Sequence, residues 1–377
     1  MNLRRTRAIA RKEFLHILRD ARSLTMALAL PFLMLLLFGY ALSLDVDRIP
    51  VVVYDRDQTP QSRDLIHQFS GSRYFHIVDT VDAYPPIERS IDSNQCLVGL
   101  VIPRDYARNL KEGRPASVQL LIDGSDSNTA GIALGYADAL VETYAAGLRD
   151  RARNRSGAAA LNPPANAQIR VWYNSDLVSR NYIVPGLIAV ILMIIASMLT
   201  SLTIAREWDN GTMEQLLSTP VRPAELVLGK LSAYFMLGIA DMLISVAIGA
   251  FVFGVPLKGS VLLLFFASCM FLFGALCWGL MLSAIARTQL LAYQMGVTSS
   301  FLPAFLLSGF IYSVGNMPKA IQAVSYIVPA RYFVTILKGI FLKGVGLNVL
   351  WLEMSFLSLY ALAVFVLATR KVRQKVV

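Results

Sequence analysis

Side chains that could do chemistry are few in this sequence, and they do not form a recognisable catalytic set. The chain contains no H-E-x-x-H zinc motif and no G-x-S-x-G nucleophile elbow. The dipeptide Gly229-Lys230 lacks the earlier glycine and the following Ser or Thr of a phosphate-binding loop. The three histidines are His16, His67 and His76. We therefore expect a chain that is not an enzyme and that has no catalytic, metal or cofactor site of its own.

Carboxylates fall into two groups with different expected roles. Asp55, Asp57, Asp123 and Asp126 follow short β-rich runs, where turn formation and helix capping explain them. Asp241 instead lies about 15 residues into an apolar run, and a carboxylate at that depth is costly unless it faces protein or water. Two interpretations stay open: a substrate or proton contact at a cavity or dimer interface, and a polar bond between helices or a shifted apolar segment.

A polar segment at 205–222 separates two apolar runs and predicts a short amphipathic helix. Gly211 is expected to end the preceding helix, Thr212 to cap the new one and Pro220 to end it. The apolar face of this helix would consist of Met213, Leu216 and Leu217. Such a helix can dock in a groove of a soluble partner, or it can be an ordinary connector among lipid headgroups.

The composition is that of a membrane protein. Of the 377 residues, 55% are hydrophobic and 16% charged, whereas a soluble domain has about 25% charged residues. A spanning helix needs roughly 20 mostly apolar residues. Six runs meet that need, so the predicted fold class is a polytopic α-helical membrane protein with six transmembrane helices. They lie at about 24–44, 183–204, 226–253, 261–284, 290–312 and 350–369.

Basic residues gather at the ends of the chain and set its predicted orientation. Residues 1–23 alternate basic and apolar positions with helical spacing, which favours an interfacial helix over a simple basic flank. Seven Lys or Arg precede the run at 24–44, and the tail at 371–377 is also basic. Both termini are therefore expected inside, by the positive-inside rule. This charge fits anionic membrane lipids and not nucleic acid.

Residues 45–181 read as an extracytoplasmic α/β domain inserted between the first and second spans. The stretch 45–180 holds 17 acidic and 15 basic residues, in contrast to the basic remainder. Short β-rich runs alternate with helical patterns, which is typical of an α/β domain. The expected strands are 49–54, 75–78, 97–102, 118–122 and 168–172, and the expected helices are 61–69, 104–111 and 129–149. Cys96 would react with an impermeant reagent from outside if its thiol is not buried.

The remainder, 182–370, is expected to hold five spans. Between the last two spans, the segment 313–342 is interrupted by Pro318, Pro329 and Gly339. It predicts a re-entrant outer hairpin of two short helices, because irregular backbone at membrane depth must be buried in protein or line a cavity.

The polar segment also carries a family resemblance. Its run R-E-W-D-N-G-T-M-E-Q-L-L-S-T-P at 206–220, followed by Glu225 and Leu228-Gly229-Lys230, resembles the signature of ABC-2 type (type-2 ABC exporter) permeases. The resemblance covers nearly the whole chain. Within the family, the chain is similar to the bacterial drug-efflux-type branch with a large periplasmic domain. It implies the transmembrane permease subunit of an ATP-driven exporter of drugs or hydrophobic compounds across the bacterial inner membrane.

The resemblance also implies partners and roles. The helix at 205–222 would be the coupling helix that contacts a separate ABC ATPase, which would use the ATP and Mg. Further implied partners are a second permease subunit, in a homo- or heterodimer, a periplasmic adaptor protein and membrane lipids. Asp241, from its depth in an apolar run and not from the resemblance, is a candidate for the translocation path or the dimer interface. By position, the coupling residues are Glu207, Gly211, Thr212, Glu214, Leu217 and Pro220.

Three alternatives remain at this point. The same machinery could export a lipid, a glycan or a peptide. A membrane-anchored sensor or scaffold could use 45–181 as a ligand-binding domain, although its inside segments are too short for a signalling domain. A membrane enzyme is disfavoured by the missing site.

Overall fold

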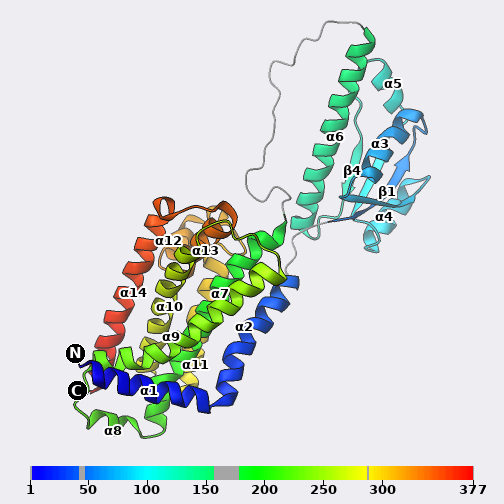
Figure 1. The fold of residues 1–377 in the computed structure, drawn as a ribbon. Coiled ribbons are helices and arrows are strands. Elements are labelled where there is room, and N and C mark those ends of the chain that lie inside the picture. Colours follow the sequence, from blue (N-terminus) through cyan, green and yellow to red (C-terminus); the bar gives the residue numbers. More distant parts are fainter. Residues whose placement is uncertain (1, 42–46, 157–177, 287, 377) are drawn as a thin grey trace. The chain divides into compact units, whose positions relative to one another are not determined.

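The chain forms two compact units in the computed structural model, which describes residues 2–41, 47–156, 178–286 and 288–376 (Figure 1). Unit 1 comprises Met1–Ser43 and Val171–Val377, and unit 2 comprises Leu44–Arg170. The predicted strand at 168–172 lies outside the described residues, as does the end of the first predicted span.

Unit 2 is built on a four-stranded sheet in the order β2-β1-β3-β4. The central strand β1 pairs in parallel with β2 and β3, and β4 runs antiparallel to β3. All five residues of β3 are buried, as expected for a strand covered on both faces. The strands are β1 (Ile49–Asp55), β2 (Phe75–Thr80), β3 (Val98–Ile102) and β4 (Gln119–Ile122).

Four helices accompany this sheet, one of them unexpected. The missed helix is α4, which carries Pro85 and Pro86 in its first turn, where the absent N–H groups have no helical partner to lose. A Pro-Pro pair in a sequence usually indicates a loop, so the helical pattern of 84–92 was not recognised. The helices are α3 (Pro60–Gly71), α4 (Tyr84–Asp92), α5 (Tyr106–Lys111) and α6 (Ser127–Ser156).

Unit 1 is a helical bundle. Its elements are α1 (Leu3–Arg19), α2 (Ala21–Ala41), α7 (Ser179–Asp209), α8 (Met213–Leu217), α9 (Pro223–Ala247) with a π-helical turn (Ile248–Val252), α10 (Val261–Ile285), α11 (Gln289–Leu307), a 3-10 turn (Val314–Asn316), α12 (Lys319–Ser325), α13 (Pro329–Lys338) with a π-helical turn (Gly339–Lys343) and α14 (Leu347–Val376). Among the described residues, five helices are long and apolar enough to cross a membrane: α7, α9 with its π-turn, α10, α11 and α14. This makes the chain a multi-pass membrane protein.

Two segments complete the comparison with the six predicted spans. The first predicted span corresponds to α2, whose described apolar part, Ala27–Ala41, is shorter than a full span. The predicted hairpin corresponds to α12 and α13 with its π-turn, which are bent by 86° at Tyr326–Val328 and make a sixth span if counted as one. The helix α14 continues to Val376, so the basic residues after 370 extend a helix instead of forming a separate tail.

The centre of unit 1 is α7, which packs against α2, α9, α10, α11 and α13. Buried residues run almost without interruption from Ile183 to Ala196, on every face of the helix. A helix that is apolar all round belongs in the middle of a bundle. At one end of the bundle, α1 lies across the other helices, and α8 lies at that same end (Figure 1).

Cys96 is buried, at 3% exposure, and packs with Val52, Ile87 and Val101. Burial also raises the pKa of its thiol, so little reactive thiolate forms. The condition attached to the labelling expectation for Cys96 is therefore not met, and this residue cannot report the side of the membrane.

Exposed serines provide the replacement probes. We predict that Ser93→Cys, on the surface of unit 2, reacts with an impermeant maleimide at least tenfold faster than native Cys96 does before denaturation, because only the thiolate of an accessible cysteine attacks. In intact cells, labelling at position 93 is expected from outside. The matched probe Ser218→Cys, after α8, should react only once the cells are permeabilised. The opposite pattern would reverse the predicted orientation.

Candidate functional site

The predicted coupling residues lie in the connection from α7 to α9. The helix α7 ends at Asp209, and Gly211 turns the chain with a φ of +69°, in the left-handed region that glycine adopts without strain. The short helix α8 follows and is anchored by Met213, which is 1% exposed. Glu214 and Gln215 face outward. The connection therefore exposes the polar side chains of Glu214 and Gln215, while the buried Met213 holds α8 against the bundle.

Thr212 does not cap α8 as the sequence predicted. Its backbone is helical, not extended, and its side chain makes no capping bond. The hydroxyl donates instead to the Glu207 carboxylate, and it also lies 3.3 Å from the Glu207 carbonyl oxygen. A charged acceptor forms the stronger hydrogen bond, which explains the preference. This contact ties the start of α8 back to the last turn of α7.

A cluster of four charges, Lys12, Glu13, Glu207 and Lys230, joins three helices beside this connection. The Lys230 ammonium of α9 lies 2.7 Å from Glu13 Oε1 of α1 and 3.2 Å from Glu207 Oε1 of α7. Lys12 of α1 adds a second cation 2.9 Å from the same Glu207 oxygen. Lys230 is 2% exposed, and Glu13 and Glu207 are also buried. The three buried charges are thus balanced by one another and by Lys12, whose side chain is 53% exposed at the edge of the cluster.

Gly229 lets α1 approach α9 closely enough for this cluster to form. A Cβ atom at position 229 would lie 2.7 Å from Ile9 Cβ and 3.1 Å from the Thr6 carbonyl oxygen of α1. Any larger side chain would push α1 away and lengthen the contact between Glu13 and Lys230. Gly229 therefore allows α1 and α9 to pack closely, and the next residue, Lys230, supplies the buried cation.

A second set of contacts joins the tip of α1 to the start of α9. The Glu225 carboxylate accepts the backbone N–H of Asn2 at 2.6 Å and that of Arg222 at 3.1 Å. The second bond satisfies an N–H group at the start of α9, as in a capping box. Arg5 donates to the carbonyl oxygen of Pro220, after α8. The N-terminal residues therefore brace both ends of the α8–α9 connection.

The structure brings some of the predicted residues together and separates others. Glu207 and Thr212 are in contact, Pro220 binds Arg5 through its carbonyl, and Gly211 forms the turn. Glu214 is exposed on α8, and the side chain of Leu217 lies outside the described residues. Asp241 lies elsewhere, in the middle of α9.

The prediction missed the residues of α1 and α9 that hold the site in place: Lys12, Glu13 and Lys230. One signal could have found Glu13. It is the only acidic residue of α1, and it shares a helical stripe with Ile9 and Ile17, the stripe that packs on the bundle. An acid on a packed stripe must be balanced by a buried cation or be neutral, so it signals a site to examine.

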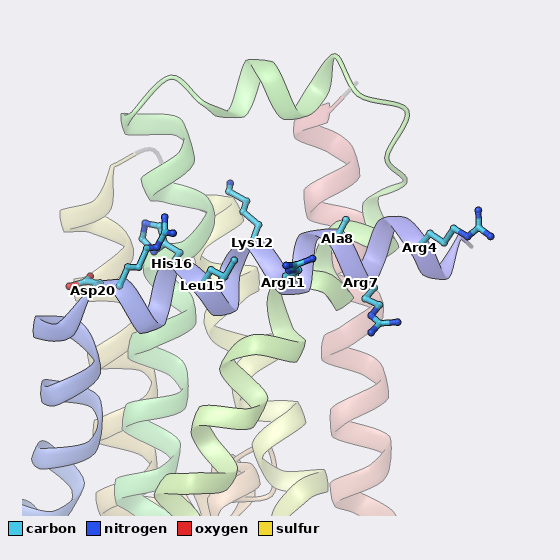
Figure 2. A pocket seen from close by; sticks show the side chains of 9 residues that line it. Arg4, Arg7, Ala8, Arg11, Lys12, Leu15, His16 and Asp20 are labelled. Carbon is cyan, nitrogen blue, oxygen red and sulfur yellow. The ribbon is translucent and has the colours of Figure 1, made fainter.

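The outer face of α1 is strongly cationic. Arginine and lysine side chains line a hollow of about 1180 Å³ along this helix, with one acidic residue at its end (Figure 2). The lining residues are Arg4, Arg7, Ala8, Arg11, Lys12, Leu15, His16, Arg19 and Asp20. Such a surface attracts anionic groups. Within the described ranges, no group of three or more His, Cys, Asp or Glu side chains could hold a metal ion.

Comparison with known proteins assigns the family. Residues 22–370 match the model of the ABC-2 family transporter proteins, and the chain belongs to that family. It is 36% identical over 343 residues to the probable multidrug ABC transporter permease YbhS of Escherichia coli (strain K12), covering 91% of this chain and 89% of YbhS.

Two further relatives from the same strain agree. The probable multidrug ABC transporter permease YbhR is 31% identical over 336 residues, which are 89% of each chain. The inner membrane transport permease YhhJ is 24% identical over 299 residues, covering 77% of this chain and 76% of YhhJ. The resemblance inferred from the run at 206–220 is confirmed.

The charge cluster generates a stability prediction. Lys230→Met should lower the free energy of unfolding by about 3–5 kcal/mol, because Glu13 loses its buried cation and keeps only the half-exposed Lys12, 4.0 Å away. Replacing both partners, in Glu13→Met with Lys230→Met, should recover part of the loss. Thermal unfolding in detergent and the rate of trypsin cleavage within α1 measure both effects. The exposed Lys319→Met is the matched control. Equal unfolding temperatures for Lys230→Met and the control would contradict a structural role for the cluster.

Proposed function

We propose that this chain is the permease subunit of an ATP-driven exporter whose ATPase is a separate chain. Its membership of the ABC-2 family implies an ATPase partner and a second permease. The sequence contains no phosphate-binding loop, so nothing in it offers a nucleotide cradle of that kind. An ATPase must then act on this chain from outside it, through a surface that can receive force.

The connection at 205–222 is that surface, and the observation that carries the proposal is the way α8 is held. The exposed polar face formed by Glu214 and Gln215 sits on the buried Met213, and charge-assisted contacts brace its surroundings. A partner that binds Glu214 and Gln215 would exert its force on α8, which is held rigidly by these contacts. Preorganised contacts of this kind transmit a displacement because packed elements move as units and do not deform continuously.

The force would reach two spans together. Thr212 bonds to Glu207 at the end of α7, and Lys230 of α9 bonds to the same carboxylate. The central helix α7 and its neighbour α9 would therefore shift with α8, and α1 would follow through Glu13. ATP binding and release would move the spans between inward- and outward-open arrangements, each with different contacts to the substrate.

The bundle leaves apolar surface for its other partners. Nine leucines on α11 and α14 are 44–69% exposed, which requires lipid or a second permease against them. They are Leu290, Leu291, Leu302, Leu306, Leu347, Leu352, Leu359, Leu362 and Leu367. The cationic face of α1 would rest against anionic lipid headgroups on the cytoplasmic side. Unit 2 would lie in the periplasm, where it could guide substrate or bind an adaptor.

Multidrug or hydrophobic compounds are the proposed substrates, because two relatives carry the name of multidrug permeases. The location would be the inner membrane, with both termini in the cytoplasm. Export of a lipid, glycan or peptide by the same machinery would share every contact described for α8. The substrate is therefore decided by transport assays and not by the coupling test.

The coupling role can be tested at α8. Glu214→Lys should weaken binding of the partner ATPase at least tenfold, about 1.4 kcal/mol, because it reverses the charge at the centre of the proposed contact. ATPase retained on the tagged permease, and export of a fluorescent hydrophobic dye from cells, measure the effect. The amount of permease in the membrane should stay the same.

The matched control is Glu142→Lys, an exposed acid on α6 of unit 2, which should leave ATPase binding unchanged. Normal ATPase binding and dye export by Glu214→Lys would overturn the assignment of α8 as the coupling helix. A loss in both variants would point to a general effect of the added charge.

A further inference from the structure

Asp241 is buried inside unit 1, and the part of the chain that the structure describes offers its carboxyl no hydrogen-bond partner. The residue is 1% exposed, and neither carboxyl oxygen has a hydrogen-bond partner among the described residues. It lies 18 residues after Pro223, about 27 Å along α9, and another 11 residues of helix follow it. An ionisable group in a span with no partner calls for a functional explanation.

Two serine hydroxyls near Asp241 are also buried without a hydrogen-bond partner among the described residues. Ser245 lies one turn further along α9, on the same face, and its Oγ has no partner among the described residues. On α10, Leu272 approaches Gly238, because a Cβ there would lie 3.2 Å from Leu272 Cδ2. Since α9 and α10 run antiparallel, one turn further brings Ser268 level with Asp241. The Oγ of Ser268 is also buried and unpartnered among the described residues.

The described residues of the helices packed against the middle of α9 bring no cation to the depth of Asp241. The helices packed against α9 are α1, α2, α7, α10 and α14. Residues 23–39 of α2 and 183–205 of α7 contain no titratable side chain. Those on the apolar parts of the others are Cys269 and Cys277 on α10, Glu353 and Tyr360 on α14, and Tyr234 on α9 itself. None of these is a cation, and Lys230 is 11 residues away and bound to Glu13 and Glu207.

An ionised Asp241 would therefore be a charge in an apolar interior with nothing to balance it, which costs several kcal/mol or more. A neutral carboxyl avoids that cost. We propose that Asp241 is a proton-binding site within the packed spans, occupied in the arrangement seen here and emptied when α9 and α10 separate enough to admit water. The proton comes from water when the O–H bond forms and returns to water when it breaks.

The site differs from a contact between two permeases, because Asp241 is already covered by its own chain. Its occupancy would link helix packing to pH: the protonated form permits the dry contact of α9 with α10, and the ionised form requires water beside the carboxylate. This second half of the proposal rests on the proposed export cycle, which supplies the movement that opens the contact.

Infrared spectroscopy of the full chain in lipid nanodiscs tests the first half. At about pH 6 a water-exposed Asp or Glu is already ionised, so the carbonyl stretch of a protonated carboxyl reports a buried proton. We expect this band in the wild type, its loss in Asp241→Asn and its retention in Glu353→Gln. In the wild type, labelling aspartate carboxyls with ¹³C should shift the band, which assigns it to an aspartate, and its loss in Asp241→Asn then assigns it to this residue. Absence of the band in the wild type, or its persistence in a folded Asp241→Asn protein, overturns the proposal.

The second half needs the permease with its ATPase, trapped with ATP and vanadate. Loss of the band in the trapped state supports emptying of the site when the spans move. An unchanged band overturns the conformational link and leaves the proton site in place. If no ATPase assembles with the chain, the proposed function fails, whereas the nanodisc result on Asp241 still holds.

Discussion

The arrangement at the α8 end of unit 1 depends on one buried ammonium group. Burial of the charged Lys230 ammonium is costly unless carboxylates replace its contacts with water. Glu13 of α1 and Glu207 of α7 provide these carboxylates. This requirement joins three segments that lie far apart in the sequence. It also places Glu207 where Thr212 can bond to it, so that α8 begins from a fixed point. A single solvation constraint thereby positions the amphipathic N-terminal helix, the central span and the connection proposed to receive the ATPase.

Two buried ionisable side chains on α9 illustrate opposite solutions to the same problem. Lys230 is satisfied by partners from other helices, which makes it a structural fastener. Asp241, eleven residues further on, has none among the described residues, so neutrality must come from a proton. The first solution stabilises one arrangement of helices. The second makes the arrangement depend on a ligand that can leave, which suits a span that must adopt more than one packing.

The motif at 206–220 gains a physical meaning from these contacts. Glu207 pairs with the buried Lys230, and Gly211 forms a left-handed turn. Thr212 donates a hydrogen bond to the Glu207 carboxylate. The later Glu225 and Gly229-Lys230 belong to the same assembly, through Asn2 and Glu13 of α1. A signature that reads as one segment is therefore a set of contacts made by three helices, and the side chains of Glu214 and Gln215 on α8 stay exposed.

Apolar runs and periodicity determined which segments of this chain become long helices, because burial of about 20 apolar residues depends on local composition alone. They also located four strands and the α8 connection, and the loop motif indicated the family. Tertiary structure alone decided the rest. It turned Thr212 away from its expected cap, accommodated the Pro-Pro start of α4 and buried Cys96. It also paired Glu13 with Lys230, 217 residues apart. Such pairings depend on which helix faces meet, and that is set by the packing of the whole bundle and not by neighbours in the sequence.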